Sequence, residues 1–392
     1  MYDALIIGAG PAGSTAARLL AKAGWSVALV EKSGFPRRKV CGEFISATSL
    51  PLLYDSGVRE GFLSEAGPEV RRVGFFARDA VLASAMPSAG KSVSGWGRAL
   101  GRERLDLLLA QSAAQAGAEI WQPWKVMALQ RTADGFVCAI GGDDSVKELR
   151  ARIVIAANGS WERSPWAMAQ RSHKPSDLLA FKAHFSDSAL PRDLMPLLVF
   201  PGGYGGMVNT DGGRVSLSCC IRRDTLDACR RDYRGQAAGE AVLQHIMSRC
   251  NGVRDALRPA GIDRTWLSAG PIRPGIRPRF SKGIFFVGNS AGEAHPIIAE
   301  GISMAMQSAW LLAQRLIGEE MDMGAAEAVA RVGQLYAKDW QSAFAGRIRA
   351  ASLFAHLPMW PSSARILPVI KRFPEILTWG ARLSGKTTQV VQ

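Results

Sequence analysis

The chain has 392 residues, of which 47% are apolar and 21% charged, and its formal net charge at pH 7 is +14. This length suffices for a full hydrophobic core and favours two packed lobes. No apolar run approaches the roughly 18 residues that a membrane span needs. The basic residues are scattered and accompany no nucleic-acid-binding motif, so we expect no nucleic acid partner. The charge instead favours an anionic small molecule or a membrane surface.

The N-terminus and the cysteines indicate the compartment. The N-terminus has no basic region or cleavage site of the kind that a secretory signal carries. The six cysteines form no CxxC pair and have no histidine partners at metal-ligand spacing. We therefore expect reduced thiols, no metal site and a cytoplasmic protein.

The first predicted elements are a strand, a glycine turn, a helix and a second strand. Residues 3–7 form a short apolar run that predicts a buried strand. Gly8-Ala9-Gly10-Pro11-Ala12-Gly13 follows directly, and residues 14–23 have helix-forming composition. Gly24 ends that helix, and residues 26–30 predict the next strand. This order is typical of a Rossmann-type βαβ unit.

Each part of this unit has a mechanical role in binding a dinucleotide. Gly8 permits the tight turn, Gly10 lets the backbone approach a pyrophosphate, and Gly13 lets helix and strand pack closely. The helix N-terminus at Pro11-Ala12 presents its positive end to phosphates. Glu31 closes the second strand, where it can accept the hydroxyls of an adenosine ribose.

The rest of the chain mixes helical and strand patterns. Residues 175–225 have the alternating apolar positions and glycine turns of an antiparallel sheet. The other expected elements are an amphipathic helix at 101–118, strands at 125–130, 136–140, 147–156 and 283–288, an apolar helix at 301–317, and a helical tail from 324.

Residues 283–306 distinguish FAD from NAD as the cofactor. They read as a strand, a glycine turn with Asn289, a proline loop with His295, and a helix that begins at Gly301-Ile302. The N-terminus of that helix can face the flavin pyrimidine ring, where negative charge gathers on reduction. The segment resembles the second FAD motif of the flavoprotein monooxygenase (p-hydroxybenzoate hydroxylase-like) superfamily. That superfamily also includes geranylgeranyl reductases and flavin-dependent halogenases.

Other segments match the same superfamily. Residues 101–106 resemble its arginine-to-aspartate helix start, which implies that Arg102 contacts the phosphates or the ribityl chain. Val126 falls where the superfamily packs backbone against adenine, and residues 153–160 resemble the strand and turn beneath the cofactor. The chain has Asn158 and Asn289 where the superfamily usually has aspartate. An asparagine still hydrogen-bonds there, without charge.

The resemblance implies an α/β fold with a Rossmann-type, glutathione reductase-like FAD-binding domain. We expect that domain at 1–165 and 276–320, an inserted and mostly antiparallel substrate domain at 166–275, and a helical C-terminal segment at 321–392. Residues 70–100 are expected to contribute to the substrate lobe. The expected cofactor-binding residues are Gly8, Gly10, Pro11, Ala12, Gly13, Glu31, Lys32, Arg37, Cys41, Gly42, Arg102, Val126, Asn289, Gly301 and Ile302.

The loop at 35–43 indicates the subfamily. Lys39-Val40-Cys41-Gly42 resembles the Lys-x-Cys-Gly loop of geranylgeranyl reductases, and the loop also resembles the Arg-x-x-Gly-Glu loop of halogenases. The resemblance implies that Arg37 and Lys39 lie near phosphates, with Cys41-Gly42 beside the isoalloxazine. The alternative is a solvated basic turn with a structural cysteine. None of the eleven tryptophans fits the halogenase Trp-x-Trp-x-Ile-Pro segment, which argues against halogenation.

Three residues are candidates for catalysis: His295, Tyr204 and Cys41. Tyr204 can hold a substrate hydroxyl or carbonyl, and His184 can serve as an acid or base, although both residue types more often serve packing. We expect an apolar or aromatic substrate between the Tyr204 sheet and the His295 loop. Its walls would include Phe181, Phe185 and Phe200.

The favoured function is an NAD(P)H-driven FAD monooxygenase that hydroxylates a lipophilic or aromatic substrate. The alternative is a flavin reductase of isoprenoid C=C bonds, and a non-catalytic FAD-binding protein is a third hypothesis. No second Rossmann fingerprint is visible, so NAD(P)H would bind transiently or a partner reductase would donate electrons. The apolar and basic tail from 351 suits peripheral membrane contact or a lid, and equally a helix packed on the core.

Overall fold

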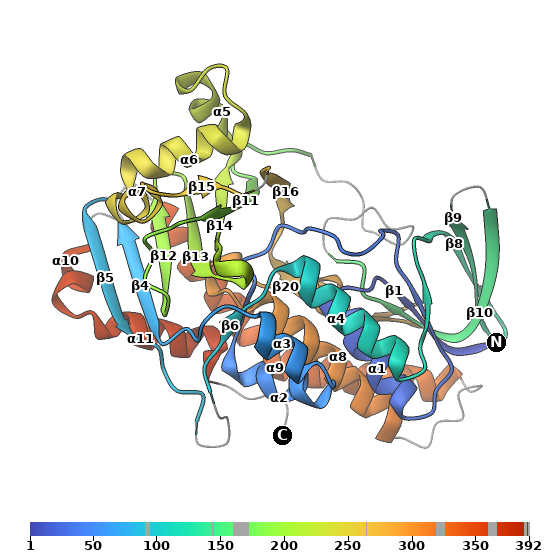
Figure 1. The fold of residues 1–392 in the computed structure, drawn as a ribbon. Coiled ribbons are helices and arrows are strands. Elements are labelled where there is room, and N and C mark those ends of the chain that lie inside the picture. Colours follow the sequence, from blue (N-terminus) through green and yellow to red (C-terminus); the bar gives the residue numbers. More distant parts are fainter. Residues whose placement is uncertain are drawn as a thin grey trace.

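The computed structural model describes residues 1–90, 95–142, 145–159, 172–263, 265–318, 326–359, 367–387 and 390. Two eight-stranded sheets lie at opposite ends of the molecule, and helices cover them (Figure 1). The predicted α/β fold class is confirmed. The predicted domain boundaries stay expectations, and the part of the predicted turn that begins at Ser160 lies outside the described residues.

The first sheet is built around parallel strands in the order β19–β10–β1–β2–β7, and β1 lies in its centre. Its strands read as unbroken apolar runs because both faces are covered. The hairpin of β8 and β9 continues antiparallel from β10. The strands are β1 (Tyr2–Ile7), β2 (Val27–Val30), β7 (Glu119–Trp121), β8 (Lys125–Thr132), β9 (Gly135–Gly142), β10 (Ser145–Ala156), β18 (Phe280–Ser281) and β19 (Ile284–Phe286).

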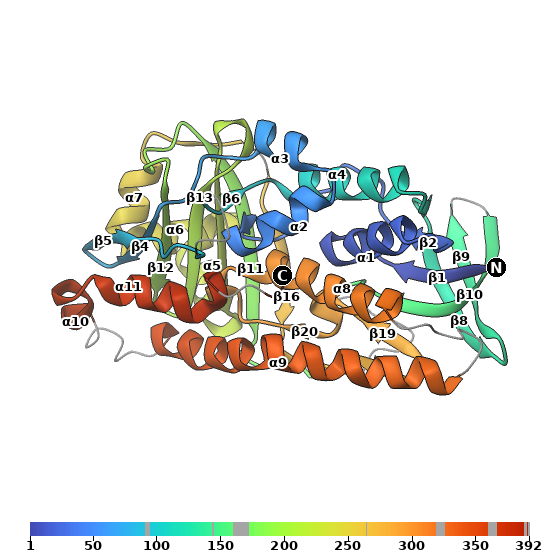
Figure 2. The same ribbon diagram turned by 90° about the horizontal axis from the view of Figure 1, so that it is seen from below.

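Helices with small residues pack closely on this sheet. Ala12, Ala16 and Ala17 of α1 are buried against Ala305 and Ala309 of α8, so the two helices approach closely. The long helix α9 passes beneath both sheets (Figure 2). The helices around the first sheet are α1 (Pro11–Lys22), α2 (Leu50–Asp55), α3 (Arg59–Glu65), α4 (Arg102–Gln115), α8 (Gly301–Gly318) and α9 (Ala326–Met359).

The second sheet is mostly antiparallel and follows the order β15–β11–β14–β13–β12–β4–β5, with β16 also paired to β11. Only its β12–β4 pair is parallel among the described pairings. The strands are β4 (Arg72–Ala77), β5 (Ala80–Ala85), β11 (Leu178–Ser186), β12 (Leu194–Phe200), β13 (Gly203–Asn209), β14 (Val215–Arg222), β15 (Gly261–Ile262) and β16 (Leu267–Ile272).

One face of the second sheet carries its own helical cover. Three helices that the sequence patterns did not predict lie on it: α5 (Arg223–Asp232), α6 (Ala238–Arg249) and α7 (Asn251–Leu257). Figure 1 shows them above the sheet, on the side away from α9. Large apolar side chains of β11 and β14 point into this layer and form a separate core with the three helices. The other face is therefore left to meet the first half of the molecule.

Short elements connect the two halves. The two small ladders pair β3 (Phe44–Ile45) with β6 (Arg98–Ala99) and β17 (Gly275–Ile276) with β20 (Gly292–Glu293). Beyond α9, α10 (Leu367–Arg372) and α11 (Glu375–Ala381) lie beside β5, and α11 also contacts β4 (Figure 1). A last helical turn at Arg382–Lys386 contacts α9. No helix among the described residues is long and apolar enough to cross a membrane.

Candidate active site

The glycine turn between β1 and α1 forms one end of the candidate site. Gly8 has φ +103°, and a Cβ on Gly13 would lie 1.8 Å from the Gly8 carbonyl oxygen, so the fold itself requires both glycines. Gly10 differs. Its φ is −78°, and the nearest atom to an added Cβ would be Arg102 Nη2 at 3.7 Å. The open space beside Gly10 is therefore available to a ligand.

Two guanidinium groups border that space. Arg37 Nη2 would lie 3.9 Å from a Cβ on Gly10, and the Nε of Arg37 is buried with no hydrogen-bond partner among the described residues. Arg102 binds Asp106 through Nε at 2.7 Å and Nη2 at 2.8 Å. Arg37 lies 3.1 Å from Glu31 and 3.5 Å from Asp106. Together with the N-terminus of α1, these cations fit a pyrophosphate.

Glu31 lies buried at the end of β2, as the ribose-binding expectation requires. Its Oε2 accepts the Ala9 N–H at 2.9 Å and its Oε1 accepts the Ser33 N–H at 3.0 Å. The Glu31 backbone is fixed by the turn after β7, where it bonds to the Trp121 carbonyl and to the Trp124 N–H. These contacts hold the carboxylate beside the glycine turn.

Three further residues of this region occupy different surroundings. Val126 is half-buried on β8, where it packs with the apolar cluster on the outer face of the first sheet. The side chain of Lys32 is exposed. Arg38, next to the predicted Arg37, reaches to the carbonyl of Thr265 at 3.1 Å and so ties this loop to the chain before β16. The cofactor-binding role of Val126 and Lys32 stays a prediction.

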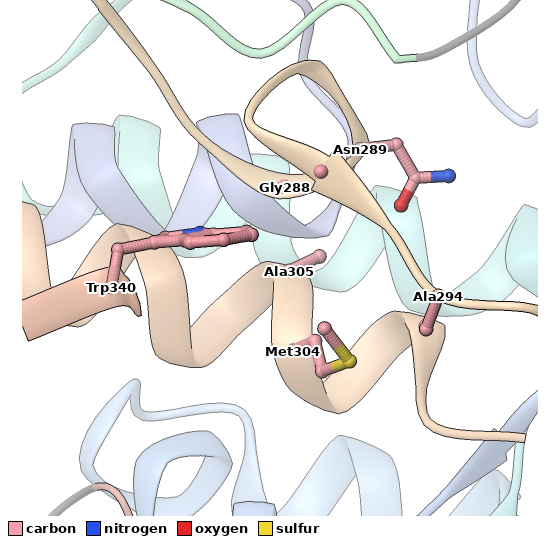
Figure 3. A pocket seen from close by; sticks show the side chains of 8 residues that line it. Gly288, Asn289, Ala294, Met304, Ala305 and Trp340 are labelled. Carbon is pink, nitrogen blue, oxygen red and sulfur yellow. The ribbon is translucent and has the colours of Figure 1, made fainter. Parts of the chain in front are cut away.

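A small cavity of about 10 Å³, too small for a flavin ring, lies at the N-terminus of α8, where the flavin end of the site was expected (Figure 3). The lining residues are Gly288, Asn289, Gly292, Ala294, Gly301, Met304, Ala305 and Trp340. Asn289 and Gly301 thus lie together, while Ile302 turns into the core. The Asn289 amide donates to Glu293 at 3.3 Å, and its side chain points away from Trp340. No local motif indicated Trp340, because it comes from α9.

The Cys41 loop runs from the arginine pair toward the second sheet. The half-buried Cys41 thiol lies against the Arg102 guanidinium, and the Glu43 N–H donates to its Sγ at 3.4 Å. Gly42 is exposed, and a Cβ on it would meet only Ser218 Oγ of β14, at 3.5 Å. Cys41-Gly42 therefore lies between the arginine pair and the second sheet, and its predicted position beside the flavin stays a prediction.

Glu43, the last residue of the loop at 35–43, forms a buried ionic cluster, and no sequence motif indicated its partners. It is 1% exposed and binds Lys182, 1% exposed, and His184, 2% exposed, both from β11. Its Oε2 lies 2.8 Å from His184 Nε2, and its Oε1 accepts the Arg102 N–H at 3.1 Å. Burial opposes ionisation of Glu43, but the Lys182 ammonium and the His184 hydrogen bond outweigh it and hold its pKa well below the usual range.

The polar partners belong to the sheet face that meets the first half of the molecule. Lys182 and His184 pair across the ladder with Ser218 and Ser216, so all four point to one face. Phe181, Ala183 and Phe185, which alternate with Lys182 and His184 along β11, point to the opposite face. The expected substrate wall was therefore wrong: the side chains assigned to it pack on α5–α7, and these are Phe181, Phe185 and Phe200.

Tyr204 and His295, the two other expected catalytic residues, are in direct contact. The Tyr204 hydroxyl hydrogen-bonds His295 Nδ1, and both side chains are buried. Burial, with Cys220 and Glu293 nearby, raises the pKa of Tyr204 well above its usual range, so the phenol stays protonated. We expected a substrate pocket between these residues. Since they touch, a substrate has to lie beside the pair and not between its members.

Three comparisons with known proteins agree with this geometry. Residues 1–328 match the family described as the FAD binding domain. Digeranylgeranylglycerophospholipid reductase 1 of Methanothermobacter thermautotrophicus is 28% identical over 327 residues, 80% of this chain and 76% of that protein. Menaquinone reductase of Mycolicibacterium smegmatis is 24% identical over 328 residues, 80% of this chain and 75% of that protein.

A solved structure confirms the fold. The myxobacterial chondrochloren halogenase, described as an FAD-dependent halogenase, superposes with a TM-score of 0.78 over 100% of this chain and 94% of that one, at 18% identity. This identity supports the fold alone. The glycine turn, the arginine pair and the α8 N-terminus are groups of the kind that bind the phosphates and the flavin ring of FAD. The chain therefore belongs to the FAD binding domain family, and it is an FAD-dependent oxidoreductase.

Proposed function

We propose that this protein reduces C=C bonds of a lipophilic, isoprenoid-type substrate, the second of the two activities considered from the sequence. The observation that carries the proposal is the extended similarity to curated reductases. The two described above, named for an archaeal geranylgeranyl phospholipid and for menaquinone, each match about four-fifths of the chain. The Cys41 loop, which resembles the geranylgeranyl reductase loop, supports the same function.

The chain offers a proton donor for such a reaction. Saturating a C=C bond consumes two electrons and two protons. Bound FAD, once reduced by NAD(P)H or by a partner reductase, would supply both electrons and one of the protons, so the chain has to supply the other proton. Tyr204 can supply a proton because burial keeps its phenol neutral. His295 Nδ1 hydrogen-bonds the phenol and can replace that proton. We assign Tyr204 as proton donor and His295 as the residue that orients it.

The face of the second sheet that meets the first half of the molecule has a charge distribution that suits an apolar substrate. Lys182 is the basic residue of that face nearest the Cys41 loop, and it is paired with Glu43 in a buried site. It is thus not available to bind an anionic substrate group. Tyr204 itself packs in an apolar cluster with Val40 and Ile297. An apolar chain needs such walls and few polar anchors.

Product analysis tests the proposal. The protein is incubated with NAD(P)H, or anaerobically with dithionite where no pyridine nucleotide is accepted, and with a detergent-dispersed geranylgeranyl lipid that carries no quinone group. The products are then examined by mass spectrometry, with and without oxygen. We expect a gain of two hydrogen atoms per saturated bond under both conditions. A gain of one oxygen atom, in air only, would establish the monooxygenase activity that the sequence favoured and refute the reductase.

A further inference from the structure

The C-terminal segment, residues 367–387, exposes a row of large apolar side chains. The exposed fractions are 49% for Val369, 56% for Phe373, 42% for Ile376, 62% for Trp379 and 58% for Leu383. Ile376 and Trp379 are three residues apart on α11 and share one face of that helix, while Val369 comes from α10, Phe373 from the break between the two helices and Leu383 from the last helical turn. We call these five residues the apolar stripe. Large apolar side chains exposed along one segment mark an interaction site.

The inward side of the segment combines buried apolar residues, Ile370 and Ala381, with polar anchors that fix its orientation. Thr378 Oγ1 donates to the Ala85 carbonyl of β5 at 2.7 Å. Lys386 is buried, and its Nζ donates to the Ile298 carbonyl at 2.6 Å and lies 3.1 Å from Glu300 Oε1. These inward contacts leave the five larger side chains of the apolar stripe toward solvent.

Basic side chains border the apolar stripe. Arg372 and Arg382 are exposed, and the Arg382 guanidinium lies 5.8 Å from the centre of the Trp379 ring. Lys371 is exposed as well and pairs with Asp79 at 3.0 Å. Glu375 is the segment's only acidic residue. Aromatic and aliphatic side chains flanked by arginine and lysine match the composition of helices that lie in the interface of an anionic membrane.

We propose that the apolar stripe docks the protein on an anionic lipid bilayer, with α10 and α11 lying in the plane of the headgroups. A second copy of the chain is a poorer occupant. A two-fold contact through the stripe would bring Arg372 and Arg382 of both copies to the same interface, where like charges repel. A bilayer with anionic headgroups neutralises them instead.

The docking segment is joined to the candidate active site. Glu300, which holds Lys386, immediately precedes α8, and its Oε2 accepts the Ser46 Oγ hydrogen at 3.0 Å. Ser46 lies in the chain that continues from the Cys41 loop. Docking would therefore set the active site close to the membrane, where a lipophilic substrate resides. This last consequence rests on the proposed function, whereas the docking itself does not.

Vesicle flotation of the oxidised, FAD-loaded protein tests the docking without any turnover. Vesicles of phosphatidylcholine mixed with phosphatidylglycerol should carry the wild type upward, and vesicles of phosphatidylcholine alone should carry much less. Ile376→Ser, Trp379→Ser and Leu383→Ser combined should lower the partition coefficient at least about tenfold, since three apolar side chains leave the lipid. FAD content and the thermal midpoint establish that the variant is folded.

A matched control removes equally exposed apolar side chains elsewhere. Met127 is 57% exposed on β8 and Val146 is 73% exposed on β10, at the other end of the molecule (Figure 1). Met127→Ser with Val146→Ser should leave flotation unchanged. A second variant, Arg372→Glu with Arg382→Glu, keeps the stripe and should abolish the preference for anionic vesicles.

Several results would overturn the proposal. The wild type could fail to float, the serine variant could float as well as the wild type, or neutral and anionic vesicles could be bound equally. A dimer in solution that the serine substitutions dissociate would show that a second copy covers the stripe. Loss of reductase activity in the product assay, with flotation intact, would count against the proposed function alone.

Discussion

The ion pair of Glu43 and Lys182 allows the most quantitative prediction. Lys182→Met removes the ammonium and leaves a carboxylate that is 1% exposed. An uncompensated buried charge of this kind destabilises a protein by about 3–5 kcal/mol. Glu43 would keep the Arg102 N–H at 3.1 Å and His184 at 2.8 Å. We therefore expect the lower end of the range, about 3 kcal/mol.

A double-mutant cycle separates this charge effect from lost packing. Glu43→Gln combined with Lys182→Met removes both charges, so the double variant should be less destabilised than the sum of the two single variants. The free energy of unfolding is measured from urea denaturation at pH 7 with a fixed excess of FAD. Strict additivity of the two single effects would refute the coupling that the geometry implies.

The same pair predicts a pH dependence. The folded-state pKa of Glu43 lies below its unfolded value, so its contribution to stability is complete above the unfolded pKa of about 4.3. That contribution is lost as the pH falls through the folded-state value. The wild type should therefore lose stability below about pH 5 more steeply than Glu43→Gln does. Parallel stability curves for the two proteins would contradict the assigned pKa shift.

Four further substitutions test the site. Gly10→Val should abolish FAD binding while the apoprotein keeps its thermal midpoint, and a Gly10 variant that retains FAD would place the pyrophosphate elsewhere. Gly13→Ala should instead prevent folding, because its Cβ would lie 1.8 Å from a carbonyl oxygen. Glu31→Ala should weaken FAD binding, measured by titration of the apoprotein, by about 1.5–3 kcal/mol, and unchanged affinity would exclude a ribose contact. Tyr204→Phe should lower turnover by about 10²–10⁴-fold with FAD content unchanged, and normal turnover would remove Tyr204 as proton donor.

The βαβ unit was predictable because its signals are local. A short apolar run, two glycines required by close packing and an acidic residue at the next strand end lie within the first 31 residues. The α8 start was equally readable, since a glycine turn and a helix beginning at Gly301 follow one another directly. Each of these patterns reflects backbone geometry that neighbouring residues determine by themselves.

The Glu43 cluster could not be read in the same way. Glu43 and Lys182 are 139 residues apart, and only the packing of the loop against β11 joins them. The sheet-face error has a related cause. Residues 181 and 182 differ by one position, so they occupy opposite faces, and which face is covered by α5–α7 depends on tertiary structure. Once the strands are paired, the alternation of side chains places Lys182, His184 and Tyr204 on the same face of the second sheet.

The most direct test of the reductase follows the flavin absorbance in the absence of oxygen. The FAD-loaded protein is reduced with one equivalent of dithionite and mixed anaerobically with a detergent-dispersed geranylgeranyl lipid that carries no quinone group. We predict that the absorbance of oxidised flavin returns at a rate that depends on lipid concentration, and that it returns far more slowly in Tyr204→Phe. Flavin that stays reduced until oxygen is admitted, with every lipid tried, would contradict the proposed C=C reduction.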